Sequence, residues 1–159
     1  METIIRIGTA GGFAPQLELR DMVVASGCIN NSRMPELLLG APDYELGPTA
    51  SLLNDVIGMG AAAGLTLHSG TVFTSDIFYE PDEELNDRMI EDGILCVEME
   101  TAALYALAQI EQKQALSLVT ISDHLTTGAR LSPEERQSTL NEMISFALQV
   151  ASNQADSIE

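Results

Sequence analysis

Two carboxylates stand close together in the stretch GILCVEMETAALYALAQ, which covers residues 93–109. Glu98 and Glu100 follow an apolar run, residues 94–97, that has the length of a buried strand, and they precede a helical pattern. A buried carboxylate is costly unless it is paired or hydrogen-bonded, so two acids here suit a polar ligand such as a diol. Alternatively they form the acidic first turn of the helix and point to water. Spacing alone leaves both interpretations open.

A second polar group, Ser122, Asp123 and His124, ends the apolar run that begins at residue 115. An aspartate at a strand end can act as a general acid, or it can cap the following loop. A Ser-Asp-His triad is excluded, because three consecutive residues cannot face one another as a triad requires.

A third group follows the first apolar run, in the stretch RIGTAGG. Arg6 and the Thr9 hydroxyl stand beside glycines whose backbone amides can approach an anion closely. We expect a Gly-rich turn here, either purely structural or binding a small anion. The stretch lacks the lysine of a P-loop and the spacing of a dinucleotide fingerprint.

The composition indicates a globular domain that avoids polyanions. Apolar residues make up 45% of the chain, and seven Lys plus Arg against 24 Asp plus Glu give a formal net charge of −17. Such a charge repels nucleic-acid phosphates and anionic membrane surfaces. We therefore expect neither nucleic acid nor membrane as a partner.

Cysteine usage and hydropathy favour a cytoplasmic location. Cys28 and Cys96 lie in apolar surroundings without CxxC spacing, so we expect two buried free thiols rather than a disulfide or a metal pair. No apolar run approaches the roughly 20 residues of a spanning helix, and no secretory leader pattern opens the chain.

Strand and helix patterns alternate along the chain, which is typical of an α/β fold with ligands at the carboxyl ends of strands. Residues 30–48 are expected to form an excursion with little regular structure. Strands are predicted from residue 2 to the Gly-rich turn and over 21–27, 65–73, 94–97 and 115–124, and helices over 49–63, 81–92, 99–112 and from 133 onward.

Two helix starts carry specific signals. Pro81 is expected at the start of one helix, with Asp82, Glu83 and Glu84 in its first turn. Ser132 is expected to cap the last helix, with Pro133 at its first position and Glu135 closing a capping box. The apolar stripe of that helix is predicted to comprise Leu140, Met143, Ile144, Ala147 and Leu148.

Several stretches resemble, in order and spacing, the hexameric bacterial type of purine nucleoside phosphorylase, within the nucleoside phosphorylase and uridine phosphorylase family. They are IIRIGTAGG, TVFTSDIFYEPDEE, GILCVEMETAALYALA, TISDHLTTG and SPEERQSTLNEMISFAL. The resemblance spans essentially the whole chain. It implies a single α/β domain over residues 1–159, with a mixed central β-sheet flanked by helices, equivalent to the C-terminal two-thirds of the family fold.

The resemblance also implies an activity, the reversible phosphorolysis of purine (deoxy)ribonucleosides to free base and pentose 1-phosphate. Phosphate is then a co-substrate, no metal or other cofactor is needed, and a homo-oligomer of the hexameric type is expected. Carried over by position, the implied site residues are Arg6 and Thr9 for phosphate, Met99 and Glu100 for ribose, Phe78, Val97, Glu98 and Ser122 for the base, and Asp123 with Arg136 for catalysis.

Family members carry a further N-terminal stretch before the counterpart of IIRIG, which contains a Gly-Asp-Pro-x-x-Arg phosphate loop. The sequence is therefore expected to correspond to an N-terminally truncated member, with an apolar sheet edge left open. Two other functions stay open: a non-catalytic subunit that binds nucleoside or assembles with full-length chains, and a nucleosidase that uses water. The preference among adenosine, inosine and guanosine also stays open.

Overall fold

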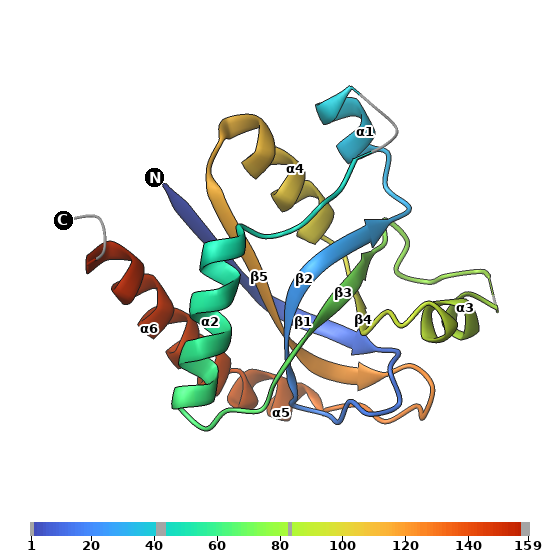
Figure 1. Ribbon diagram of the computed structural model, residues 1–159. Coiled ribbons are helices and arrows are strands. Elements are labelled where there is room, and N and C mark those ends of the chain that lie inside the picture. Colours follow the sequence, from blue (N-terminus) through green and yellow to red (C-terminus); the bar gives the residue numbers. More distant parts are fainter. Residues whose placement is uncertain (1, 41–43, 83, 157–159) are drawn as a thin grey trace.

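Five strands pair into one mixed sheet in the computed structural model, which describes residues 2–40, 44–82 and 84–156 (Figure 1). The strands are β1 (Thr3–Gly12), β2 (Met22–Asn30), β3 (Leu67–Thr74), β4 (Cys96–Glu98) and β5 (Gln114–His124). They follow the order β1-β4-β3-β2-β5, and β5 pairs again with β1, so the sheet closes into a barrel. β1 and β5 run parallel to each other and antiparallel to their neighbours β4 and β2.

Helices cover the sheet from several sides (Figure 1). They are α1 (Met34–Leu39), α2 (Ala50–Ala62), α3 (Leu85–Glu91), α4 (Thr101–Glu111), α5 (Pro133–Thr139) and α6 (Asn141–Asp156). The predicted α/β fold with a mixed central sheet flanked by helices is thus confirmed. The described part of the expected excursion over residues 30–48 contains a helix that the sequence pattern missed, the short α1.

Separate apolar clusters join the helices to the sheet. Under α4, the buried residues Ala102, Tyr105 and Ala106 pack against strand residues such as Val23. The Tyr105 hydroxyl donates to the backbone oxygen of Ala25 at 2.8 Å, so this buried polar group is satisfied. On another side, α2 and α6 pack together over β2 and β5, with residues such as Leu52, Val56, Phe146 and Val150 buried. The helices therefore hold the strands that carry the polar groups.

α3 begins later than the proline predicted. The helix starts at Leu85 rather than at Pro81, because Asp82 first forms a turn whose backbone oxygen accepts from the Leu85 N–H at 3.2 Å. The Asp82 side chain accepts from the Glu84 N–H at 3.0 Å and pairs with Arg88. Glu83, expected in the first turn, lies outside the described residues.

The last helical region is divided at Leu140, the C-terminal cap of α5. The predicted capping box of Ser132 and Glu135 is present. The predicted apolar stripe is wrong for two positions, Ile144 and Leu148, of which Leu148 is 66% exposed. α6 turns a different face to the sheet, which buries Met143, Phe146, Ala147 and Val150.

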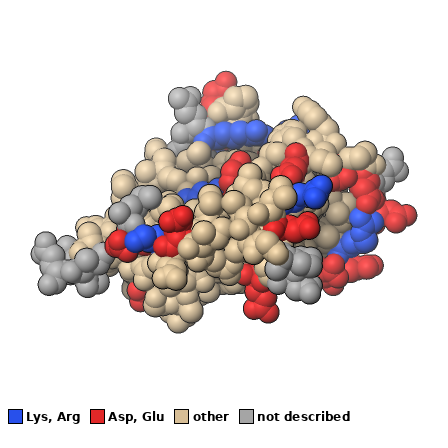
Figure 2. Space-filling model, turned by 90° about the horizontal axis from the view of Figure 1, so that it is seen from above, with Lys and Arg blue, Asp and Glu red and all other residues tan. Residues whose placement is uncertain are grey.

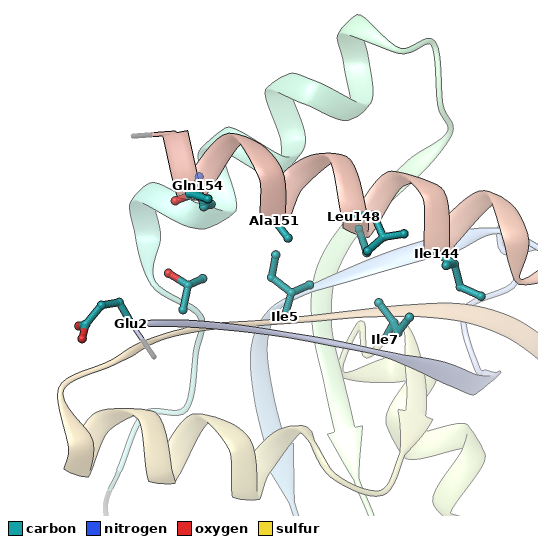
Figure 3. Close-up of a pocket in the computed structure, with 10 residues that line it drawn as sticks. Glu2, Ile5, Ile7, Ile144, Leu148, Ala151 and Gln154 are labelled. Carbon is teal, nitrogen blue, oxygen red and sulfur yellow. The ribbon is translucent and has the colours of Figure 1, made fainter. Parts of the chain in front are cut away.

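Ile144 and Leu148 instead line an apolar groove between α6 and β1 (Figure 3). The groove has a volume of about 450 Å³, and Ile5 and Ile7 of β1 face the helix across it. Because successive strand residues point to opposite faces, the groove lies on the face of β1 opposite Arg6.

The glycines of RIGTAGG belong to a strand, not to the expected turn. β1 continues through Gly11 and Gly12, with a register shift after Ala10. A Cβ at Gly11 would lie 3.3 Å from side-chain atoms of Leu125 and Val97, so the crowded crossing of β1, β4 and the loop after β5 accounts for the small residue.

One edge of β1 is largely open, as the resemblance led us to expect. Residues 3–12 all pair with β5, whereas β4 pairs only with Gly11 and Gly12. Within the described part of the chain, the remainder of that edge has no strand beside it, and unpaired strand edges are sites where further chains can add.

Packing across β3 can be tested at Gly70. An added Cβ would lie 2.6 Å from Cδ1 and 2.8 Å from Cγ of the buried Leu95, so one of them must shift. We expect Gly70→Ala to lower the free energy of unfolding in urea by about 1–3 kcal/mol. Gly58→Ala in α2 is the matched control, because nothing lies within 4 Å of its added Cβ. Equal effects of the two changes would contradict this packing.

Candidate functional site

The candidate site residues meet around Gly11. This residue pairs with Val97 of β4 on one side and with Asp123 of β5 on the other. The ends of β1 and β5 and the short strand β4 therefore lie together. The sheet thus places the two acidic stretches that the sequence singled out on either side of β1.

The first polar group is centred on the guanidinium of Arg6, which contacts both Glu98, the last residue of β4, and Glu100, which follows the strand. Its Nη2 lies 3.1 Å from Oε2 of Glu98 and is also hydrogen-bonded to Glu100. Nη1 donates to the hydroxyl of Ser117 at 3.1 Å. A Cβ at Gly8 would lie only 3.1 Å from Nη2, so the glycine leaves room for the guanidinium along the strand.

The two acids have different environments. The Glu98 side chain is 0% exposed, whereas the Glu100 side chain is 63% exposed. Neither forms an acidic first turn, because α4 begins after both, at Thr101. Glu98 accepts hydrogen bonds from the backbone N–H groups of Glu100 and Thr101, each at 2.9 Å, and so satisfies the start of the helix.

A buried hydroxyl links Glu98 to the thiol of Cys28. The Thr74 hydroxyl donates to Glu98, and its oxygen lies 3.1 Å from Cys28 Sγ. Burial raises the pKa of the Cys28 thiol to about 11, and burial likewise raises the pKa of Cys96. Both cysteines are free, as predicted, and they stay neutral thiols at neutral pH.

The second polar group is centred on Asp123. Its Oδ1 accepts from Arg136 Nη2 at 2.7 Å, and its Oδ2 accepts from the Ser122 hydroxyl at 2.8 Å. Ser122 is buried, whereas Asp123 and Arg136 are partly exposed. The two residues that the resemblance implied for catalysis, Asp123 and Arg136, therefore form an ion pair in this structure.

The start of α5 delivers Arg136 to this position. The Glu135 carboxylate accepts from the Ser132 N–H at 2.9 Å, and the Ser132 hydroxyl accepts from the Glu135 N–H. These bonds with Ser132, together with Arg20, hold the pKa of Glu135 below its usual range. Arg136 Nε also donates to the Leu131 backbone oxygen, which orients its guanidinium toward Asp123.

Three other predicted site residues are not in contact with these groups. Phe78 is 75% exposed and packs edge-on against Tyr79, with ring centroids 5.0 Å apart. Met99 is also exposed, between the two acids. Thr9 pairs with Thr120, and strand alternation places its side chain on the face opposite Arg6.

The sequence interpretation missed the buried hydroxyls of this site. It treated residues 115–124 as apolar until the end, yet Ser117 is fully buried within the strand and contacts both Arg6 and the Thr101 hydroxyl. A polar residue inside a strand buried on both faces was the available signal, because such a group needs a partner. Thr74 gave a weaker signal, since it simply ends β3.

Charge and metal chemistry add little to this site. On the face shown in Figure 2, the basic side chains are scattered among acidic ones and form no continuous patch. Among the described residues no cluster of His, Cys, Asp and Glu has the arrangement of a metal site. No helix in that part of the chain is long and apolar enough to cross a membrane.

A carboxylate-arginine group and an aspartate-arginine pair on either side of Gly11 thus form a candidate small-molecule site on an α/β fold. The chain belongs to the Phosphorylase superfamily, whose model matches residues 1–155.

The chain is also similar to curated proteins of this superfamily that are named purine nucleoside phosphorylase DeoD-type. The one from Anoxybacillus flavithermus is 41% identical over 156 residues, covering 97% of this chain and 65% of the relative. The one from Geobacillus kaustophilus is 44% identical over 153 residues, with 95% and 64% covered. The one from Myxococcus xanthus is 38% identical over 151 residues. The chain spans about 65% of the length of the curated relatives it matches.

Proposed function

We propose that this chain carries out purine nucleoside phosphorolysis. In this reaction the bond between C1′ of the sugar and N9 of the purine breaks, and a phosphate oxygen forms the new bond to C1′. The products are the free base and (deoxy)ribose 1-phosphate, and the base takes up a proton. Positive charge develops on the sugar and negative charge on the base, so an anion is needed at one end and an acid or hydrogen-bond donor at the other.

The observation that carries the proposal is that two separate groups, each with an arginine and a carboxylate, lie along β1. Arg6 offers a partly exposed cation, in contact with the exposed carboxylate of Glu100. Further along the strand, at Gly11, Asp123 stands in an ion pair with Arg136. A phosphate could bind at Arg6, the sugar diol at Glu100 and the purine near Asp123. This order along the site matches the order of phosphate, sugar and base in the reacting complex. The curated relatives, which are named for this activity, support the same assignment.

The site residues have the following roles in this proposal. Asp123 protonates or hydrogen-bonds purine N7 as the base leaves, and Arg136 orients and compensates its carboxylate. Arg6 binds phosphate, Met99 and Glu100 bind the ribose, and Phe78, Val97 and Ser122 line the base. The Thr9 side chain lies on the face of β1 opposite Arg6, so Thr9 is left out of this phosphate site. Phe78 has an exposed ring that is free to stack on a purine. Phosphate is a co-substrate, and neither a metal nor another cofactor takes part.

The cellular location and the assembly of the chain are part of the proposal. The domain acts in the cytoplasm as a homo-oligomer, and the two free buried thiols suit a reducing compartment. The open edge of β1 and the groove beside it suit a chain that is covered by further polypeptide.

The experiment is to incubate the purified chain with inosine or adenosine, with and without phosphate, and to measure free base. Release that depends on phosphate supports the proposal. Release without phosphate would instead indicate a hydrolytic nucleosidase. Nucleoside binding without release of base would indicate a non-catalytic binding subunit.

A further inference from the structure

Glu98 is the only acidic residue that is buried among the described residues. A buried carboxylate without partners is strongly unfavourable, so its contacts must compensate its charge. They come from two other strands, β1 and β3, and from the start of α4, so Glu98 connects several elements of the fold and is not a surface group.

The contacts of Glu98 satisfy both of its carboxylate oxygens. One carboxylate oxygen accepts from the Thr74 hydroxyl, and the other accepts from two backbone N–H groups and lies 3.1 Å from Arg6. Three of these contacts fall on Oε2 and one on Oε1, so both carboxylate oxygens are bonded within the protein. Since the side chain is also fully buried, Glu98 has no surface with which to touch a ligand.

Glu98 and Ser117 hold the Arg6 guanidinium from neighbouring elements. Glu98 ends β4 and contacts Nη2, while Ser117 lies in β5 and contacts Nη1. The Nε–H and one Nη1–H have no partner among the described residues, and the side chain is 16% exposed. The guanidinium is thus fixed on its protein side and keeps donors for an anion.

The same carboxylate positions the residue proposed to bind the sugar. Glu98 accepts the N–H of Glu100, which fixes the backbone from which the exposed Glu100 side chain leaves. One buried group therefore sets the relative placement of the cation and the exposed acid.

We propose that Glu98 is a positioning residue of the phosphate subsite, which holds Arg6 where it binds the anion and does not itself touch the nucleoside. The identity of the anion as phosphate rests on the proposed function, whereas the restraint on Arg6 is present in the free protein.

The test is Glu98→Gln. The glutamine oxygen can still accept from the N–H groups of Glu100 and Thr101, and its amide can donate to Thr74, so the shape is kept while the charge facing Arg6 is lost. We expect phenylglyoxal to modify Arg6 about tenfold faster, as measured by mass spectrometry of the peptide that contains it. We also expect KM for phosphate to rise about tenfold, with kcat and KM for inosine changed by less than about twofold.

Glu111→Gln is the matched control, because it removes the same charge from the exposed end of α4. It should change neither the Arg6 modification rate nor KM for phosphate. If circular dichroism shows that Glu98→Gln does not fold, Ser117→Ala provides the test. This variant keeps Glu98, so the rate of Arg6 modification should rise by less than about twofold. A tenfold rise in Ser117→Ala would show that Ser117, not Glu98, holds Arg6.

Two results would overturn the inference: an unchanged Arg6 modification rate in Glu98→Gln, or a rise in KM for inosine with KM for phosphate unchanged. The second result would place Glu98 at the nucleoside. If the wild-type chain released no base, the proposed function would fail, but the Arg6 modification rate would still decide whether Glu98 positions Arg6.

Discussion

Replacing Asp123 with asparagine is expected to lower kcat for adenosine and inosine by about 10²- to 10³-fold, with KM for the nucleoside nearly unchanged. Asparagine keeps the size of the side chain, and its oxygen can still accept from Arg136 or Ser122. It cannot supply a carboxylic proton or compensate a proton on N7, which the leaving purine needs. Steady-state kinetics at saturating phosphate measure the change.

A substrate control separates acid catalysis from damage to the site. A purine nucleoside methylated at N7 already carries the positive charge that protonation would create. With this substrate, kcat of Asp123→Asn should therefore fall by less than about tenfold relative to wild type. Asp92→Asn, at the exposed end of α3, is the matched protein control and should behave as wild type. Equal losses with the methylated and unmethylated nucleosides would remove Asp123 from the acid role.

Arg6→Met should both destabilise the chain and abolish its use of phosphate. Methionine keeps an unbranched apolar stem but carries no charge, so the buried Glu98 loses its ion-pair partner. Removing one partner of a buried ion pair costs about 3–5 kcal/mol of stability. Because Arg6 is partly exposed, we expect the free energy of unfolding to fall by about 3 kcal/mol. Urea denaturation measures this loss, and kcat/KM for phosphate should fall by at least about 100-fold.

A second substitution distinguishes the two consequences of Arg6→Met. Adding Glu98→Gln removes the uncompensated charge, so most of the lost stability should return while the use of phosphate does not. Arg33→Met, at the exposed start of α1, is the control and should alter neither property. If the double variant is no more stable than Arg6→Met alone, the Glu98 charge is not the source of the loss.

The parts of the fold that follow from local chemistry could be predicted from the sequence. The capping box at Ser132 and the continuous apolar run of β5 depend on a few neighbouring residues, and both are present. The start of α3 could not be read from Pro81, because the Asp82 turn competes with the first helical turn. Ile144 and Leu148 fit a helical stripe as well as the residues that are buried, and only the angle at which α6 packs on the sheet decides between them.

The candidate site divides in the same way. Two acids close to a strand end were visible at Glu98 and Glu100, but their common partner Arg6 is more than ninety positions away along the chain, and no short stretch indicates it. The Arg6 contacts arise because β1 passes between β4 and β5, a pairing that no short stretch encodes. Likewise, the joint role of Asp123 and Arg136 was implied by the resemblance and not by spacing, and the structure adds the contact between them.

The pairing of β1 with β5 also has a consequence for how the chain reaches its native state. Thr3 pairs with Gln114, and the register continues to Gly12 and His124, so β1 finds this partner only after most of the described chain that follows it has been made. Until then Ile4, Ile5 and Ile7 lack this partner strand, and the long loop must close before the pairing contributes stability. We therefore expect slow refolding, in milliseconds to seconds rather than microseconds, limited by the meeting of the two strands. During synthesis we expect chaperones to bind β1, because its apolar side chains stay exposed until β5 has been made.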